Sequence, residues 1–309
     1  MSTVEINYIP STNHKNQLHV VKWRPDDKVK AILQISHGMI EHIKRYDDFA
    51  RYLNSKGILV VGNDHLGHGK TANCEEELGY FDAEDSSQTV VNDLYEVTKH
   101  TKALYPDVPY FLLGHSMGSF MVRRYLMTYG MQLDGAIIMG TGHQSKAMLK
   151  MGKMTYKVLK LFKGPKYRSK LMTYCSIGHY NKGFAPNRTS CDWLSANQTN
   201  VDTYLKDAYC QFDFTINGYN TIFNTFLFIN KPSNIAKIPN ELPILFIAGE
   251  EDPVGNNGKG VKKVYEAFKK AGLSNLELKL YPKLRHEILN ELDKEEVYQD
   301  IYRWIKKNI

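Results

Sequence analysis

Cysteine is scarce in this chain, and the few cysteines are widely separated. Only four of the 309 residues are cysteines, and no two of them stand in a Cys-x-x-Cys pair: Cys74, Cys175, Cys191 and Cys210. This spacing excludes a disulfide framework and the common cysteine zinc sites, so we expect neither a bound metal nor a structural disulfide. Reduced thiols are typical of the cytoplasm, where we expect the protein to reside.

Long apolar runs are also missing. The longest reach about six residues, whereas a transmembrane helix needs about 20. The first five residues, Met1 to Glu5, offer neither the basic nor the apolar region of a secretory signal. We therefore expect no transmembrane segment and no signal peptide. The apolar share of 42% is nevertheless ample for a buried core, and the length suits one large domain, with or without an insertion.

Acidic residues are absent from residues 135–191, although the whole chain has a net charge of only +7. Within this stretch lysines recur every three or four residues: Lys146, Lys150, Lys153, Lys157, Lys160 and Lys163. Apolar residues follow the same spacing: Ala147, Met151, Met154, Val158 and Leu161. The pattern predicts an amphipathic helix with one apolar and one cationic face.

Two interpretations of this helix are open. In the first, the face from Lys146 to Lys163 contacts an anionic lipid surface, and the methionines border an acyl chain. In the second, the apolar face packs on the protein's own core and the lysines are merely solvated. Aromatic residues are sparse among these lysines and no nucleic-acid-binding module is recognisable, so we expect no nucleic-acid partner.

Short apolar segments alternate with longer periodic segments along most of the chain. The predicted strands are 18–23, 31–36, 58–62, 109–113, 135–139, 244–248 and 276–281. The predicted helices are 46–55, 86–104, 119–129, 260–271 and 294–307. This alternation predicts an α/β fold with a mostly parallel central sheet flanked by helices.

The alternation stops between about His143 and Lys237, where helical pieces are separated by glycines and prolines. Because a loop of this length is uncommon in a compact domain, we expect an inserted, mainly helical subdomain. The predicted organisation is a core in two parts, residues 1–142 and 238–309, with the insertion at 143–237.

A Gly-x-Ser-x-Gly motif centred on Ser116 follows the predicted strand 109–113 and precedes the predicted helix 119–129. In this context the motif is a nucleophile elbow, a turn so sharp that Gly114 and Gly118 have no room for side chains. The turn leaves the serine hydroxyl exposed beside a helix N-terminus. Ser116 is therefore the predicted nucleophile.

A serine nucleophile needs a base, and the base needs an orienting acid. In this architecture the chain order is serine, acid, histidine. His286 is the only histidine after His179 and follows the predicted strand 276–281, so we assign it as the base. Asp252 follows the strand 244–248 and precedes a proline that fixes the loop, so we assign it as the acid. Its neighbours Glu250 and Glu251 remain alternatives.

The oxyanion hole of such a site needs two backbone N–H groups directed at one point. Met117, directly after the nucleophile, supplies one. Met39 is the candidate for the other, because it follows the strand 31–36 and Gly38, which permits a close backbone approach.

The sequence resembles the α/β-hydrolase superfamily, in particular its monoacylglycerol lipase and lysophospholipase-like branch, also labelled serine aminopeptidase S33. Four segments carry the resemblance: His37-Gly38-Met39-Ile40-Glu41-His42 with Arg45-Tyr46, then Asn63-Asp64-His65-Leu66-Gly67-His68-Gly69, the elbow at Ser116, and Asp252-Pro253-Val254 with Arg285-His286-Glu287. The resemblance implies an α/β-hydrolase fold with a helical cap inserted after the sixth strand. It also implies the site residues already assigned: Ser116, Asp252, His286, Met39 and Met117.

The resemblance and the predicted site together indicate a serine hydrolase that cleaves small carboxylic esters without a cofactor. Monoacylglycerols, lysophospholipids and short-to-medium acyl esters are the expected substrates. One alternative is an aminopeptidase related to proline iminopeptidases, which needs cap carboxylates to hold an ammonium group. The candidates for that role are Asp192, Asp202, Asp207 and Asp213. A second alternative is a binding protein that retains the triad.

Overall fold

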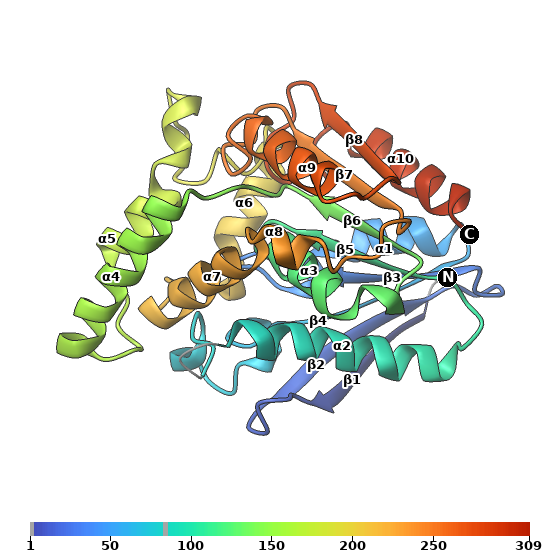
Figure 1. The fold of residues 1–309 in the computed structure, drawn as a ribbon, viewed down its shortest axis with the longest axis horizontal. Helices are drawn as coiled ribbons and strands as arrows, with labels where there is room; N and C mark the ends of the chain where they lie inside the picture. Colours follow the sequence, from blue (N-terminus) through green and yellow to red (C-terminus); the bar gives the residue numbers. More distant parts are fainter. Residues whose placement is uncertain (1–2, 83–85) are drawn as a thin grey trace.

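A computed structural model describes residues 3–82 and 86–309, which form one eight-stranded sheet with helices on both faces (Figure 1). The strands lie in the order β1-β2-β4-β3-β5-β6-β7-β8. Their bounds are β1 Thr3–Pro10, β2 Gln17–Arg24, β3 Ala31–Ser36, β4 Ile58–Asn63, β5 Tyr110–His115, β6 Gly135–Met139, β7 Ile244–Gly249 and β8 Leu276–Tyr281. The pairs β1–β2 and β2–β4 are antiparallel and all others are parallel, which confirms the predicted architecture.

The first strand, β1, was not among the predicted strands. It pairs with β2 over its whole length at one edge of the sheet, and three of its apolar side chains, Val4, Ile6 and Tyr8, are exposed. Met1 and Ser2, which belong to the segment considered for a signal, lie outside the described residues.

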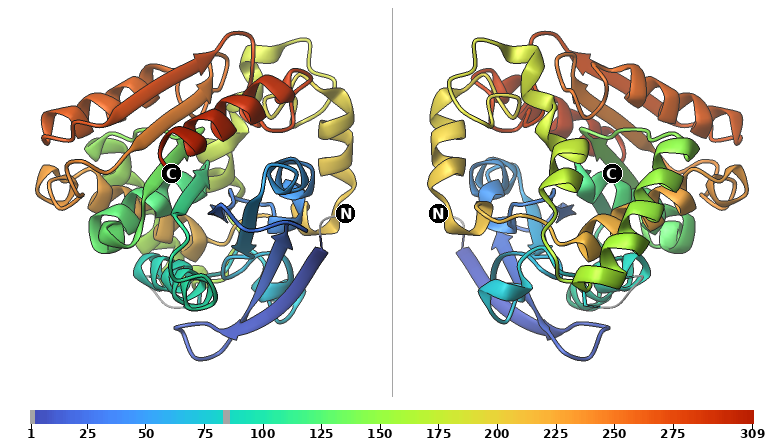
Figure 2. Two further views of the ribbon diagram at one scale, coloured as in Figure 1. Left: turned by 90° about the vertical axis from the view of Figure 1, so that its right-hand side faces the viewer. Right: turned by 90° about the vertical axis from the view of Figure 1, so that its left-hand side faces the viewer.

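The helices of the core cover the two faces of the sheet (Figures 1 and 2). One face packs against α1 (Asp47–Asn54) and α10 (Lys294–Lys307), and the other packs against α2 (Ser87–Leu104), α3 (Met117–Tyr129) and α9 (Lys259–Lys270). Strands β3 to β7 are buried throughout because both faces are covered. These five helices lie where the sequence predicts them, within two residues at each end.

Further helices lie between β6 and β7, and several of them project from the body of the sheet at the left of Figure 1. Their bounds are α4 Lys146–Lys163, α5 Lys170–Thr173, α6 Gln198–Lys206, α7 Ile216–Ile229 and α8 Pro232–Ile235. Within the described ranges, no helix has both the length and the apolar character needed to cross a bilayer.

Helix α4 packs on the protein through other side chains than the sequence pattern predicts. The residues that pack inward are Leu149 and Tyr156, and the Lys153 ammonium donates to the amide oxygens of Asn220 and Asn224 on α7. The predicted apolar face points outward instead: Met154 is 70% exposed and Leu161 is 79% exposed. The helix therefore does not pack on the core through its predicted apolar face.

Strands β3 and β5 are neighbours at the centre of the sheet, yet β4 lies on one side of β3 and β5 on the other. The chain thus leaves β3 in one direction and later returns to its opposite side. At such a switch point the loops beyond the carboxyl ends of the strands diverge and leave a crevice. Ser116 and the loop that begins at His37 stand at the edges of this crevice.

Candidate active site

The elbow has the backbone conformation that the sequence motif requires. Ser116 lies between β5 and α3 with φ 52° and ψ −120°, and its N–H donates to the Met139 carbonyl oxygen at 3.0 Å. A positive φ is costly for a residue with a side chain and persists only where the surroundings enforce it. Such strain at the end of a central strand is characteristic of the nucleophile elbow.

The two glycines of the motif have no room for a side chain. A Cβ on Gly114 would lie 2.5 Å from the Gly118 carbonyl oxygen and 2.6 Å from a methyl of Val122. A Cβ on Gly118 would overlap the carbonyl oxygens of Ser36 and His37. The elbow therefore depends on close backbone packing between α3 and the ends of β3 and β5.

Asp252 and His286 lie together, although they follow different strands. The His286 Nδ1 and the Asp252 Oδ1 are 2.9 Å apart, and both residues are buried. The same Oδ1 accepts the Val254 N–H at 2.8 Å, which fixes the carboxylate. The alternatives Glu250 and Glu251 are exposed. The geometry thus favours Asp252 as the partner of His286.

Ser116 and His286 line the same cavity, of about 470 Å³. Among the described residues, no hydrogen bond joins the Ser116 hydroxyl to the His286 imidazole. The structure thus pairs the predicted acid with the predicted base and places the predicted nucleophile in the same cavity without that bond. Contacts of this kind are often long in the free protein and tighten as substrate binds.

The loop after β3 approaches the elbow closely. A Cβ on Gly38 would lie 3.2 Å from the Ser116 Cβ. Across the part of the chain that the structure describes, the Met39 N–H has no hydrogen-bond partner. The Met117 N–H is the first in α3, so it has no acceptor within the helix. Both predicted oxyanion donors are therefore available to a ligand in the cavity.

A buried ionic network holds this loop against the elbow. Glu41 accepts hydrogen bonds from the Gly38 N–H at 2.5 Å and the Tyr46 hydroxyl at 2.9 Å, and its Oε1 lies 3.0 Å from the His115 Nδ1. Burial alone would raise the pKa of Glu41, but the hydrogen bond and charge of His115, together with Arg45, hold it well below its usual value. Burial would likewise lower the pKa of His115, yet Glu41 outweighs it and the net shift is upward.

Arg45 connects the network to the loop of the predicted base. Its guanidinium donates to Glu41 at 3.0 Å and to both carboxylate oxygens of Glu287 at 2.6 and 2.7 Å. Asn200, on α6, donates to the same Glu287 carboxylate at 2.7 Å. Three distant segments of the chain therefore meet at one guanidinium. Glu41, Arg45 and Glu287 stand in the motifs that resemble the family, but their pairing joins distant parts of the sequence and is visible only in the fold.

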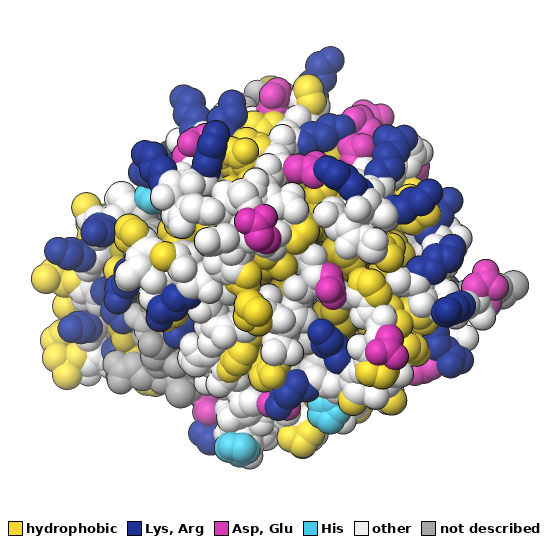
Figure 3. Space-filling view, turned by 45° about the vertical axis from the view of Figure 1, so that its right-hand side comes forward, with side chains coloured by type: hydrophobic (Ala, Val, Ile, Leu, Met, Phe, Trp, Pro, Cys, Tyr) yellow, Lys and Arg dark blue, Asp and Glu magenta, His cyan; other side chains and the backbone are white. Residues whose placement is uncertain are grey.

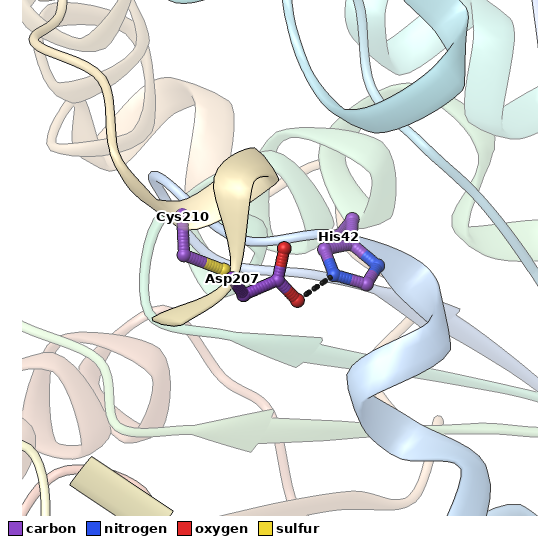
Figure 4. A group of neighbouring side chains, drawn as sticks. All are labelled: His42, Asp207 and Cys210. Atoms are coloured by element: carbon purple, nitrogen blue, oxygen red, sulfur yellow. Dashed lines mark hydrogen bonds and ion pairs between the residues drawn. The ribbon is translucent and has the colours of Figure 1, made fainter. Parts of the chain in front are cut away.

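His42, Asp207 and Cys210 form a group whose ligating atoms lie within 4.8 Å of one another (Figure 4). The His42 Nε2 and the Asp207 Oδ2 are 2.8 Å apart, so this contact ties the loop after β3 to the segment after α6. Burial raises the pKa of the Cys210 thiol by more than the positive charge of Arg45 lowers it. A protonated thiol and a nearby guanidinium both oppose cation binding, so we interpret the group as a polar contact between two segments.

One wall of the cavity is apolar. It is lined by side chains from α4, α5 and α7, among them Met148, Leu149, Met151, Leu171, Phe223 and Phe226. Several of these residues are partly exposed, so the cavity opens beside α4. An apolar wall next to a serine on an elbow suits an acyl chain bound through its carbonyl group.

The sheet topology and the elbow define the chain as an α/β-hydrolase. Within that class, residues 27–293 match the model of the family described as "Serine aminopeptidase, S33", so the chain belongs to this family. The match confirms the predicted family membership and, with the structural neighbours below, the predicted α/β-hydrolase fold.

Several known proteins are similar to this chain over nearly its whole length. The monoglyceride lipase of Mus musculus is 28% identical over 297 residues, which cover 93% of this chain and 86% of the relative. The monoacylglycerol lipase of Mycolicibacterium smegmatis is 24% identical over 297 residues, covering 93% and 92%. The structure of a carboxyl esterase from Bacillus coagulans superposes with a TM-score of 0.91 at 30% identity, covering 99% of this chain and 98% of the esterase.

Proposed function

We propose that this chain hydrolyses carboxylic esters through an acyl-serine intermediate formed on Ser116. The observation that carries the proposal is one arrangement: a serine on a strained elbow shares a cavity with a buried histidine paired to an aspartate. Two N–H groups beside the serine, for which the described residues offer no partner, complete the set that acyl transfer requires. The names of the relatives support an ester as the substrate.

In the proposed reaction, the Ser116 oxygen attacks the ester carbonyl while the His286 Nε2 takes the hydroxyl proton. The Met39 and Met117 N–H groups stabilise the oxyanion, and Asp252 holds the imidazole and stabilises its charged form. The carbon–oxygen bond to the leaving alcohol then breaks, and His286 returns the proton to that alcohol. Water, activated by the same imidazole, attacks the acyl-serine and releases the acid.

The apolar wall favours substrates with an acyl chain: monoacylglycerols, lysophospholipids, or short-to-medium acyl esters. The helices between β6 and β7 supply that wall, so we propose that residues 143–237 act as a cap over the site, between core segments 1–142 and 238–309. All four cysteines are free thiols, and on this basis we propose a cytoplasmic location.

The cap carboxylates argue against the aminopeptidase alternative. Asp192 accepts hydrogen bonds from residues 188 and 189, Asp202 pairs with Arg188, and Asp207 contacts His42. Among the described residues, the carboxylates that line the cavity are Glu41 and Glu287, and both are paired with Arg45. A substrate ammonium would therefore find no uncompensated carboxylate in the cavity. The other alternative, a binding protein that retains the triad, predicts no sustained turnover.

A hydrolysis panel tests the proposal. We would compare p-nitrophenyl esters from acetate to palmitate, monoacylglycerols, lysophosphatidylcholine and proline β-naphthylamide, with wild type and Ser116→Ala in parallel. The expected result is sustained ester turnover that falls by on the order of 10³-fold or more in the variant. Cleavage of the naphthylamide in preference to every ester would favour the aminopeptidase. A single burst without turnover would favour the binding protein.

The exposed face of α4 supports a second element of the proposal, contact with an anionic lipid surface. Met151, Met154, Val158 and Leu161 are exposed on a helix whose lysines have no acidic neighbours in residues 135–191. Figure 3 shows Lys or Arg side chains beside hydrophobic ones at its left edge, whereas charges of both signs mix elsewhere on that face. Apolar side chains ringed by lysines beside a cavity entrance suit docking at a membrane surface.

A further inference from the structure

The imidazole of His286 contacts two other rings. The His115 ring, at the end of β5, has its centroid 4.7 Å away on a plane tilted by 38°. The indole of Trp193, from the segment between β6 and β7, has its centroid 5.1 Å away at 36°. Tyr180 contacts the indole in turn, with ring centroids 5.0 Å apart. The cap thus places a large π system beside the proposed base.

Hydrogen bonds hold the main chain on both sides of Trp193. The Glu287 N–H donates to the Leu194 carbonyl oxygen at 2.8 Å, so the residues that follow His286 and Trp193 are joined. Arg285 donates to the carbonyl oxygens of Asp192 and Ser195, at 2.5 and 3.3 Å. The residues around Trp193 are therefore joined to those around His286 by main-chain and guanidinium contacts that need no ligand.

When His286 takes the serine proton, a positive charge forms on a ring that faces the indole. A cation within about 6 Å of an indole centroid is attracted by the negative face of the ring, most strongly where water is excluded. His286 is 3% exposed. The indole therefore favours the imidazolium over the neutral imidazole.

We propose that Trp193 is a positioning residue for the reaction, which holds the His286 ring in place and stabilises its imidazolium form as the serine proton is transferred. This inference rests on the proposed ester hydrolysis. It extends that mechanism because it assigns the cap a part in proton transfer in addition to substrate binding.

Other charged or titratable groups around His286 also affect its imidazolium form, some favourably and some unfavourably. A substitution at Trp193 leaves all of these groups in place. The Asp252 carboxylate, after β7, also favours the imidazolium. His115, at the end of β5, opposes it when protonated, and Glu41 behind His115 offsets that charge. Glu287, next in the chain, is neutralised by Arg45. On the cap side, Tyr180 contacts the indole.

The test is the pH dependence of kcat/KM for p-nitrophenyl butyrate, a soluble ester, in Trp193→Leu and Trp193→Phe. Loss of the indole removes a favourable contact of the charged ring, so the midpoint of the acidic limb of the rate profile should move down by roughly 0.5–1 pH unit in Trp193→Leu. The maximal rate should fall by about threefold to tenfold, because the charged ring is less stabilised in the transition state. Trp193→Phe, which keeps a smaller π face and most of the packing, should lie between the two.

Tyr209→Leu is the matched control, because Tyr209 makes an edge-on contact with a different histidine, His42, with ring centroids 5.8 Å apart. Its acidic midpoint should equal that of wild type. A lower rate in Trp193→Leu with an unmoved midpoint would show a merely structural role and would overturn the inference alone. Absence of ester turnover in the wild type would overturn the proposed function, and the inference with it.

A second measurement does not depend on turnover. Protonated imidazole quenches indole fluorescence, so in Ser116→Ala the emission of Trp193 should fall on acidification. Trp193→Phe in the Ser116→Ala background retains Trp23 and Trp304, so its emission is the background to be subtracted. Addition of His286→Gln should abolish the pH-dependent component. A component that persists in that variant would place the quenching group elsewhere and contradict the contact.

Discussion

Gly118 lies directly against the Ser36 carbonyl oxygen, so the helix that follows the elbow packs on the end of β3 through bare backbone. We expect Gly118→Ala to destabilise the protein by about 3 kcal/mol or more, because the backbone on both sides would have to move. Thermal unfolding measures the effect. Gly183→Ala is the control, since a Cβ there meets nothing within 4 Å. Equal melting temperatures for the two variants would show that the elbow tolerates a side chain.

The acid of the site can be assigned by three isosteric substitutions. Asp252→Asn should lower ester turnover by on the order of 10³-fold, because the amide no longer holds His286 in the correct tautomer. Glu250→Gln and Glu251→Gln should stay within about twofold of wild type, since both side chains are exposed. The measurement is kcat/KM on a soluble ester. A larger loss of kcat/KM in either glutamate variant than in Asp252→Asn would show that the glutamate is the acid of the site.

Stability should fall on acidification, because three buried histidines lie together beside the site. Burial lowers the pKa of His68 to about 3, and it also lowers the pKa values of His37 and His65. In the unfolded chain a histidine has a pKa of about 6.5. The unfolded state therefore binds more protons below that pH. The stability from His68 is complete above about pH 6.5 and is lost progressively as the pH falls toward 3.

Each such histidine should contribute about 1.4 kcal/mol of lost stability per pH unit in that range. Urea unfolding between pH 5 and 8 measures the slope. His68→Gln should reduce the slope whatever its effect on absolute stability, whereas His100→Gln, at an exposed position, should leave it unchanged. Identical slopes in all three proteins would show that His68 is not kept neutral in the folded state.

Arg45 neutralises two buried carboxylates at once. Arg45→Met should cost about 3–5 kcal/mol of stability, because Glu41 and Glu287 would remain buried without a counter-ion. Turnover should fall as well, since both the Met39 loop and the His286 loop lose their anchor. Chemical unfolding and kcat measure the two effects. Arg303→Met, at an exposed arginine, is the control and should change neither.

The outward lysines of α4 should govern vesicle binding. Replacement of Lys146, Lys150, Lys157 and Lys163 by glutamine should weaken co-sedimentation with anionic vesicles, each lysine contributing about 1 kcal/mol at low salt. Lys153 is excluded because it bonds to α7. Hydrolysis of a soluble short ester should be unchanged, which separates docking from damage to the cavity. If wild type stays in the supernatant with both anionic and neutral vesicles, the lysines are only a solvated face.

The elbow and the pairing of Asp252 with His286 could be anticipated because their signals are local. Glycines on both sides of a serine indicate a turn that has no room for other side chains. The position of a carboxylate or a histidine just past a buried strand is set by that strand. Strand β1 also carried a local signal, the alternation of Val4, Ile6 and Tyr8 with polar residues. It was missed because an exposed edge strand lacks the continuous apolar run of a buried one.

Features that depend on packing could not be predicted in the same way. The spacing of α4 predicted an amphipathic helix, but its Met and Leu side chains face outward and Lys153 bonds inward to α7. The contact of Arg45 with Glu287 joins residues 242 positions apart, and the contact of Trp193 with His286 likewise joins distant parts of the sequence. No sequence periodicity reports such contacts.

The meeting of distant segments at Arg45 sets an order in which the contacts of this region can form during synthesis. The elbow and the Met39 loop leave the ribosome before Asp252, His286 and Glu287. Until those later residues have emerged, the Arg45 guanidinium lacks one of its two carboxylates and Asp252 cannot pair with His286. A nascent chain can thus complete β5 and its elbow before the ionic network around them exists.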